Sequence, residues 1–288
     1  MTTWKISQKT FLLFLLLLIL LLLCTTSCNS VEPPENGDGQ DTTSHNFIFQ
    51  TWTFGTIGGS TLYDCAIISP ENIWCVGEIM IADTSINGYT TYNAVHWDGN
   101  EWELHKITVE FRGNMITPAL EGIFSFSSTD IWFVGSLPIH GDGENWIMYD
   151  LRTTLDPNIS LSKAWGSSSE DMYFVGRSGS IAHYQNGNWQ RIVSGTDLNI
   201  NDIWGITDEY GIRFMLCPAY NFASGGEKKL ISLSNNTVGE IPWMDNRELY
   251  TVWFNSRNKI YAGGEGLFYR TNNQWTEETL PELFKFRV

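Results

Sequence analysis

A six-residue phrase recurs along the chain with drifting spelling, and no other feature limits the possible folds as strongly. Its copies are 72–77 (NIWCVG), 130–135 (DIWFVG), 171–176 (DMYFVG) and, more loosely, 259–264 (KIYAGG). A supersecondary unit that cannot bury its own apolar face must stack on copies of itself, so recurrence at roughly 40 to 60 residues indicates a propeller or a solenoid.

The N-terminal segment has the order of a secretory signal. Lys5 and Lys9 precede an uninterrupted apolar run over 11–23. That run is about 13 residues long, whereas a helix needs roughly 20 to cross a bilayer core. We therefore expect an export signal, and a membrane helix stretched over 4–24 is the alternative.

The end of this segment, Thr25-Thr26-Ser27-Cys28, resembles the bacterial lipobox, in which small residues precede a cysteine that receives diacylglycerol. The resemblance implies a signal peptide over 1–27 and lipidation of Cys28. The polar, Pro- and acid-rich tract over 28–46 is then a disordered tether, and 47–288 is the folded domain. An ordinary Cys28 thiol beside a conventional cleavage site is the alternative.

The charge balance excludes one class of partner. Without residues 1–27, which hold two lysines and no acid, 15 basic residues face 32 acidic ones, a formal charge near −17. A surface this acidic repels nucleic acid, so no nucleic-acid partner is expected.

The folded domain reads as all-β, because short β-branched and aromatic runs alternate with Gly, Asn, Asp and Ser. The clearest unit, 161–192, predicts four antiparallel strands and hence one propeller blade. Five such units are visible. The other four are expected at 63–67, 73–77, 94–97 and 102–104, with an insertion over 82–92; at 122–126, 131–135 and 146–149, with a degenerate last strand; at 202–206 and 212–215, where 217–230 replaces a tight hairpin; and at 250–254, 260–264, 266–269 and 275–276.

The sequence alone does not decide which segment closes the ring of blades. The alternating stretch 49–54 suggests an outer strand that completes the last blade, whereas 283–288 could begin a sixth blade. Because rings of six to eight blades are common, truncation from a larger ring is one interpretation of the chain. The apolar flanks of the first and last blades would then be partly uncovered.

Repeated residues are expected to have structural roles. The aromatic residues of the phrase should wedge between adjacent blades, as should a second set at the fourth strands. The glycines Gly77, Gly135 and Gly176 should end the second strand where the chain turns. The two aromatic sets are Trp74, Trp132, Tyr173 and Tyr261, and Trp102, Trp189 and Trp275.

The repeated phrase is part of a longer pattern, which reads Ser-x-x-Asp-Ile-Trp-x-Val-Gly, a turn, then aliphatic-x-His-Tyr/Trp-x-Gly-x-x-Trp. This pattern resembles the repeat of many bacterial envelope lipoproteins with β-propeller bodies. It covers about 52–275. The resemblance implies the fold and an envelope location, but it implies little about function because such families are mostly uncharacterised.

Few residues suggest chemistry, and no catalytic, cofactor-binding or metal site is predicted. Cys65 and Cys75 should lie on neighbouring strands, where a disulfide is conceivable, although buried apolar roles are the simpler interpretation for the cysteines. The loop 140–144 (HGDGE) could contact a metal but lacks calcium-loop spacing, so a solvated turn is favoured. The candidates for a carboxylate pair in the central channel are Asp64, Glu121 and Asp202.

Three functions are compatible with this sequence. The favoured one is a non-enzymatic, lipid-anchored module outside the cytoplasm that binds a protein or a glycan, with long insertions over 79–92 and 216–229 as candidate binding loops. The alternatives are a carbohydrate-active hydrolase or lyase and an assembly factor for an envelope complex. Asn29 after Cys28 mildly favours the outer membrane.

Overall fold

The computed structural model describes residues 50–221, 226–243 and 247–278, and the chain divides into two units, Met1–Trp52 and Thr53–Val288. The signal segment 1–27, the whole tether 28–46 with Cys28, and the terminal stretch 283–288 lie outside the described residues. Among the residues that are described, no helix combines the length and apolar character needed to cross a membrane.

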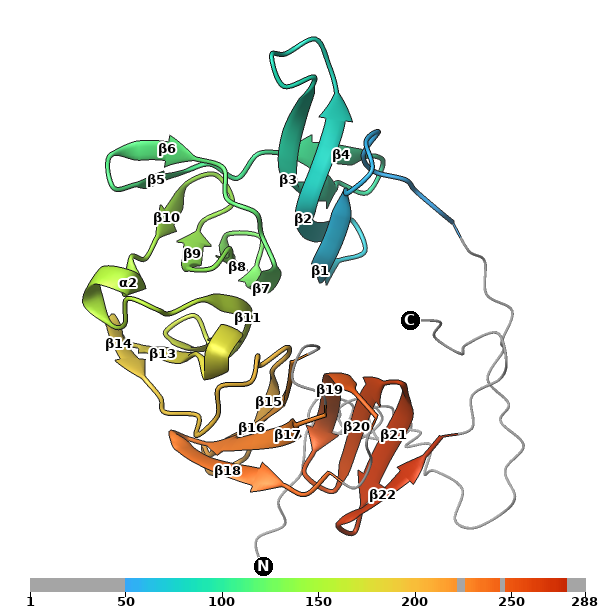
Figure 1. Cartoon of the computed structure of the whole chain (residues 1–288), viewed down its shortest axis with the longest axis vertical. Coiled ribbons are helices and arrows are strands. Elements are labelled where there is room, and N and C mark those ends of the chain that lie inside the picture. Colours follow the sequence, from blue (N-terminus) through green and yellow to red (C-terminus); the bar gives the residue numbers. More distant parts are fainter. Residues whose placement is uncertain (1–49, 222–225, 244–246, 279–288) are drawn as a thin grey trace, which may run out of the picture. The chain divides into compact units, whose positions relative to one another are not determined.

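The unit Thr53–Val288 contains five four-stranded antiparallel sheets, each a meander in which consecutive strands pair (Figure 1). This confirms the predicted all-β propeller and its five visible blades. In chain order the strands are β1 Thr61–Ser69, β2 Asn72–Ala82, β3 Tyr89–Trp97 and β4 Trp102–His105 in blade one; β7 Gly122–Ser127, β8 Asp130–Val134, β9 Pro138–Gly141 and β10 Trp146–Met148 in blade two; β11 Leu161–Ser168, β12 Asp171–Gly176, β13 Ile181–Gln185 and β14 Asn188–Arg191 in blade three; β15 Trp204–Thr207, β16 Arg213–Tyr220, β17 Lys228–Ser234 and β18 Thr237–Ile241 in blade four; and β19 Leu249–Ser256, β20 Lys259–Gly264, β21 Gly266–Thr271 and β22 Gln274–Glu277 in blade five.

Smaller elements join the blades. A two-stranded hairpin of β5 Val109–Phe111 and β6 Asn114–Ile116 follows blade one, and a short helix α2, Leu151–Thr154, follows blade two. The blades succeed one another through their first strands, because β1 contacts β7, β7 contacts β11, β11 contacts β15, and β15 contacts β19.

Each junction between neighbouring blades holds one apolar cluster. We call the face of a blade that meets the following blade its front, and the opposite face its rear. At the junction of blades one and two, Trp74 and Val76 of the front of blade one pack with Ile123 and Phe133 of the rear of blade two. The same order repeats at the other three junctions.

The repeated aromatic residue of the second strand is the wedge between blades, as predicted for three of its four copies. Trp74, Trp132 and Tyr173 are buried, and each belongs to the cluster formed with the following blade. Their polar tips reach across as well, since Tyr173 donates a 3.1 Å hydrogen bond to Asn236 of blade four. Tyr261 is only half-buried, because no blade follows it within the described residues.

Two of the three repeated glycines lie where the second strand ends, as predicted, because β12 ends at Gly176 and β8 ends at Val134, just before Gly135. Strand β2 continues through Gly77 to Ala82, so this glycine does not end the strand. A Cβ atom on Gly77 would lie 2.0 Å from the carbonyl oxygen of Thr61, and one on Gly176 would lie 2.2 Å from that of Ser160. Only glycine fits there, because the backbone at the start of the first strand passes directly over it.

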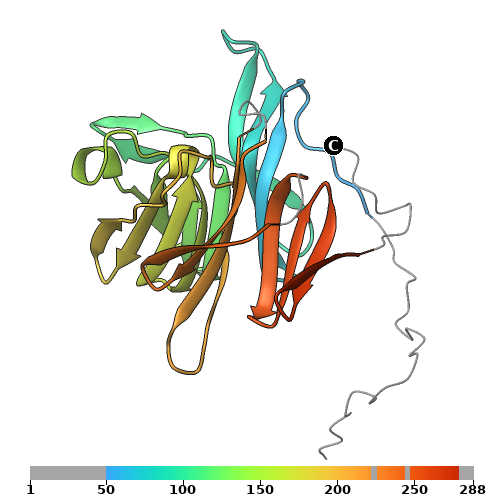
Figure 2. The same cartoon turned by 60° about the horizontal axis from the view of Figure 1, so that its bottom comes forward.

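Two blades differ from their sequence-based description. In blade two, 146–149 was expected to be the third strand, but β9 is the third strand and β10 is the fourth. The expectation failed because the β8–β9 turn is very short and includes Ser136 at φ 64°. In blade one, the insertion is partly strand: β2 and β3 pair as far as Ala82 and Tyr89, and this long hairpin projects beyond the other blades (Figure 2).

The stretch 50–54 forms no strand and so does not complete the last blade as predicted. Phe54 instead lies 5.4 Å from Trp102 of blade one, measured between ring centroids. The predicted hairpin turns are confirmed, since Gly99, Asn186, Gly187, Asn272 and Asn273 all have positive φ.

A polar contact, partly buried in blades one and two and buried in blade three, also repeats in the first three blades. A histidine of the third strand stacks on the wedge aromatic and bonds to the residue that begins the second strand. These pairs are His96 with Asn72 at 2.9 Å, His140 with Asp130 at 2.9 Å, and His183 with Asp171 at 2.8 Å. His140, expected in a loop, therefore belongs to β9 and has the same role as the other two.

Candidate binding site

A β-bulge in the first strand of blades one, three and five precedes one side chain at an equivalent position of each blade. The register shifts between Leu62 and Asp64 in blade one and between Leu161 and Lys163 in blade three, opposite the repeated glycine each time. Bulges of this kind re-aim the following side chain. The equivalent positions across the five blades are Asp64, Gly122, Lys163, Asp202 and Thr251.

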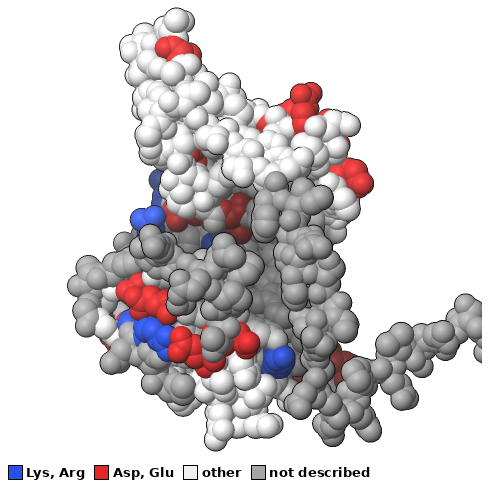
Figure 3. Space-filling model, turned by 90° about the vertical axis from the view of Figure 1, so that its right-hand side faces the viewer, with Lys and Arg blue, Asp and Glu red and all other residues white. Residues whose placement is uncertain are grey.

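These positions bring opposite charges together. The Nζ atom of Lys163 lies 2.8 Å from the Asp64 carboxylate and donates a 3.2 Å hydrogen bond to the carbonyl oxygen of Tyr63. Figure 3 views the side that contains blades one and five, and it shows acidic and basic side chains together in the hollow there.

The three carboxylates named from the sequence have different surroundings. Asp64 also accepts a 3.2 Å hydrogen bond from the amide of Ile123, and Asp202 accepts bonds from the Thr251 hydroxyl and the amide of Val252. Each of the two thus ties its own blade to the first strand of the next. Burial raises the pKa of Asp202, and the nearby Lys163 charge opposes that rise.

Glu121 does not join this group. Its carboxylate pairs with Arg177 at 3.2 Å, and the Arg177 side chain is largely exposed. The channel carboxylates are therefore held by backbone amides, a hydroxyl and a lysine. Such an arrangement positions the first strands relative to one another.

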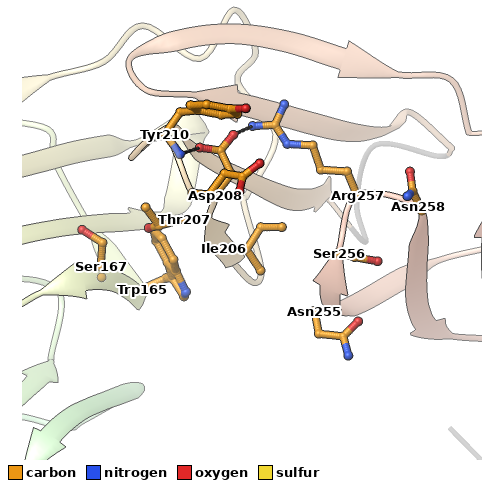
Figure 4. A pocket seen from close by; sticks show the side chains of 13 residues that line it. Trp165, Ser167, Ile206, Thr207, Asp208, Tyr210, Asn255, Ser256, Arg257 and Asn258 are labelled. Atoms are coloured by element: carbon orange, nitrogen blue, oxygen red, sulfur yellow. Dashed lines mark hydrogen bonds and ion pairs between the residues drawn. The ribbon is translucent and has the colours of Figure 1, made fainter. Parts of the chain in front are cut away.

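A pocket of about 880 Å³ opens where the turns between first and second strands of blades three, four and five converge (Figure 4). Trp165 and Ile206 provide apolar surface, and Tyr210 stands at the side. Asn255 and Asn258 supply amide groups from blade five. The remaining lining residues are Gly166, Ser167, Gly205, Thr207, Asp208, Glu209, Ser256 and Arg257.

Asp208 organises the blade-four turn at this pocket. Its Oδ1 atom accepts hydrogen bonds from the amides of Tyr210 at 3.0 Å and Ile212 at 2.8 Å. Its Oδ2 atom accepts a 3.4 Å hydrogen bond from Arg257 of blade five. The turn is thereby held against blade five, and the Tyr210 side chain remains 82% exposed beside the pocket.

The chemistry of this pocket suits binding. An aromatic ring, apolar floor residues and paired donors and acceptors are the features that hold a ligand by contact and hydrogen bonding. Within the described ranges, no three or more His, Cys, Asp or Glu side chains gather as metal ligands would. At the loop 140–144, Asp142 accepts hydrogen bonds from the amides of Glu144 and Asn145, which agrees with the favoured turn interpretation.

Sequence reasoning did not find this pocket. It proposed long insertions as binding loops, whereas the pocket is lined by short turns from three blades that lie far apart in the sequence. One signal was present: the blade-four turn over 208–212, between the paired Thr207 and Arg213, is longer than the two-residue turn between the paired Ser69 and Asn72 of blade one.

Comparisons with known proteins agree on the fold. No protein-family model and no curated protein sequence matches the chain. Among solved structures, YCF48 bound to D1 peptide aligns with a TM-score of 0.52 and 16% identity over 80% of this chain and 71% of that one. The WD40 propeller domain of Doa1 aligns with a TM-score of 0.52 and 7% identity, over 77% and 70%.

A third match is the extracellular domain of BT4673 from B. thetaiotaomicron, with a TM-score of 0.49 and 12% identity over 82% of this chain and 36% of that one. At these identities, the likeness to the YCF48 and Doa1 structures shows a shared β-propeller fold and nothing finer. The chain is thus similar in fold to the propellers of YCF48 and Doa1.

Proposed function

We propose that this protein is a non-enzymatic binding module that holds an extended segment of a partner protein at the pocket between blades three, four and five. The observation that carries the proposal is the combination of the exposed Tyr210 ring with the Asn255 and Asn258 amides around an open volume of about 880 Å³. A pocket of this size lies within the range of known ligand sites.

Two further points support a polypeptide ligand. Asn side chains offer both a donor and an acceptor, which matches the alternating groups of an extended backbone. The YCF48 structure of similar fold was solved with a peptide bound, as its name states. An assembly role in an envelope complex is one form that such binding would take.

Site-specific crosslinking tests the proposal. A photo-crosslinking residue at Asn258 reports on the pocket, and one at Ile86 reports on the tip of the blade-one hairpin, where Ile86 is fully exposed. In cells of the native host we expect crosslinks from position 258 to one discrete protein. Mapping should place them in a short segment, and a synthetic peptide of that segment should bind the purified protein.

Tyr210→Ala supplies the quantitative test. We expect it to weaken binding of that peptide about tenfold, or roughly 1.4 kcal/mol, while the melting temperature stays unchanged because the ring is exposed. Ile86→Ala is the matched control and should leave binding unchanged. Crosslinks from position 86 and not from 258, or unchanged binding by Tyr210→Ala, would contradict this pocket as the binding site.

We further propose that the protein is lipidated at Cys28 and held outside the cytoplasm, with the outer membrane as the favoured location. The lipobox-like Thr25-Thr26-Ser27-Cys28 and the polar tract after it support this, since two or more acyl chains give stable anchoring. The intact mass of membrane-extracted protein should show a chain that begins at Cys28 and carries acyl groups. Cys28→Ala should abolish both features, and an unmodified mass would overturn the proposal.

A further inference from the structure

Two thiols face each other across the first two strands of blade one. Cys65 of β1 is the direct antiparallel partner of Cys75 of β2. Directly opposed residues in such a ladder have Cα atoms about 4.5–5.5 Å apart, and disulfides commonly span about 4.4–6.8 Å between Cα atoms. A bond between the two sulfurs therefore requires no backbone movement.

In the blades that follow another blade, the positions equivalent to Cys65 and Cys75 hold apolar residues. There, the residues pack against the blade before them, on the rear face. Blade one has no preceding blade in the described part of the chain, so Cys65 is exposed and Cys75 half-buried, whereas Cys217 is buried. The corresponding pairs in blades two, three and five are Ile123 with Phe133, Ala164 with Phe174, and Val252 with Ala262.

The surroundings shift the pKa values of the two thiols in opposite directions. A hydrogen bond from the Cys75 thiol lowers the pKa of Cys65 to about 6, burial and Asp64 oppose this, and Lys163 adds to it. The same hydrogen bond raises the pKa of Cys75. The hydrogen bond therefore favours Cys65 over Cys75 as the thiolate, and thiolates are the attacking species in exchange with disulfides.

We propose that Cys65 and Cys75 form a redox-active dithiol that closes reversibly to a cross-strand disulfide by exchange with an external disulfide. The Cys65 thiolate attacks one sulfur of the oxidant, forms a mixed disulfide and releases the first thiol. Cys75 then loses its proton and attacks the Cys65 sulfur, releasing the second thiol. Starting from the Cys65 thiolate, the protein loses two electrons and the one proton of Cys75. The oxidant gains the two electrons and leaves as one thiolate and one thiol, and the thiolate takes a proton from water.

Oxidised glutathione is the probe, used on the full chain over a series of oxidised-to-reduced ratios. Cleavage after Glu35, Glu71 and Glu78 separates the peptide that holds Cys65 from the peptide that holds Cys75, and both from Cys24 and Cys28. We expect a Cys65–Cys75 linked peptide that appears with oxidation and disappears with reduction. In the reduced protein at pH 7, Cys65 should be alkylated at least roughly tenfold faster than the buried Cys217.

Single substitutions identify the order of the two steps. Cys75→Ser should stop the reaction at a mixed disulfide on Cys65, seen as one added glutathionyl mass. Cys65→Ser should form little adduct at position 75, and it serves as the matched control. The proposal is overturned if native protein shows neither the linked peptide nor adducts, or if both thiols react with alkylating reagent only after unfolding.

Discussion

Lys163 of blade three and Asp64 of blade one form a 2.8 Å ion pair across the central channel. These blades are not neighbours, since blade two lies between them in the row. Both side chains are mostly shielded, at 20% and 26% exposure, so the pair is less screened by water than a surface pair. The pair joins two blades that no apolar cluster joins.

Removing the lysine should therefore destabilise the protein. We expect Lys163→Met to lower the free energy of unfolding by about 1–2 kcal/mol, because Asp64 is left without its cation. Urea unfolding measures this change. The double variant with Asp64→Asn should lose less than the sum of the two single losses, and strict additivity would show that the pair is not coupled.

Asp171 should make stability depend on pH. Burial raises its pKa, but hydrogen bonds from His183, Arg213 and Ser167 outweigh burial and hold the pKa well below its usual range. A depressed carboxyl pKa stabilises the fold above its unfolded value of about 3.9, and this contribution is lost as pH falls through the folded pKa.

Asp171→Asn should consequently cost about 3–5 kcal/mol at pH 7, because the Arg213 side chain, 19% exposed, loses its partner at 2.6 Å. The difference from the unsubstituted protein should shrink below about pH 4. Asn72→Asp in blade one is a useful comparison, since Asn is the natural residue there. A pH-independent difference for Asp171→Asn would show that the carboxylate charge is not what stabilises the site.

The glycine beneath the first-strand bulge should not accept a side chain. Gly176→Ala places a Cβ atom 2.2 Å from the carbonyl oxygen of Ser160, so we expect a loss of about 1–3 kcal/mol. Gly58→Ala is the control, because no atom lies within 4 Å of its added Cβ. Thermal unfolding compares the two, and equal melting temperatures would mean that the bulge shifts without cost.

The rear of blade one, which no blade covers within the described residues, should promote self-association. Ile67 of β1 is 71% exposed, and Trp253 on the front of blade five is 48% exposed. Ile67→Lys should reduce the concentration-dependent increase in mass measured by light scattering. Ile147→Lys, at 67% exposure on β10, is the matched control and should have no such effect; equal behaviour of the two variants would argue against a special role for this flank.

The sequence predicted the blades because their signals are local. The repeated phrase, the hairpin turns and the wedge residues Trp132 and Tyr173 each depend on residues that are close in the chain or occupy one repeat position. Blade two was misassigned because a very short turn brings β9 so soon after β8 that the strand was mistaken for a loop. His140 was misplaced with it.

The site was less predictable because it depends on contacts between blades. Asp64 and Asp202 were named as channel residues, and the structure places both at equivalent positions of their blades, but their partners Lys163 and Thr251 could not be paired from the sequence. The pocket around Tyr210 combines turns of three blades, and no local pattern records which turns will meet. The simplest interpretation of the cysteines as buried apolar residues was right for Cys217 and wrong for Cys65.

The half-buried Tyr261 shows that the two ends of the row of blades differ. Trp74, Trp132 and Tyr173 each insert into the rear of the blade that follows, whereas within the described residues no blade lies in front of Tyr261 and none lies behind blade one. The front of blade five and the rear of blade one therefore differ in shape, and one kind of surface cannot cover both. Any element that covers both faces must therefore have two different sides. The side toward Tyr261 must accept an aromatic ring, and the side toward the cysteine pair of blade one must insert its own side chains.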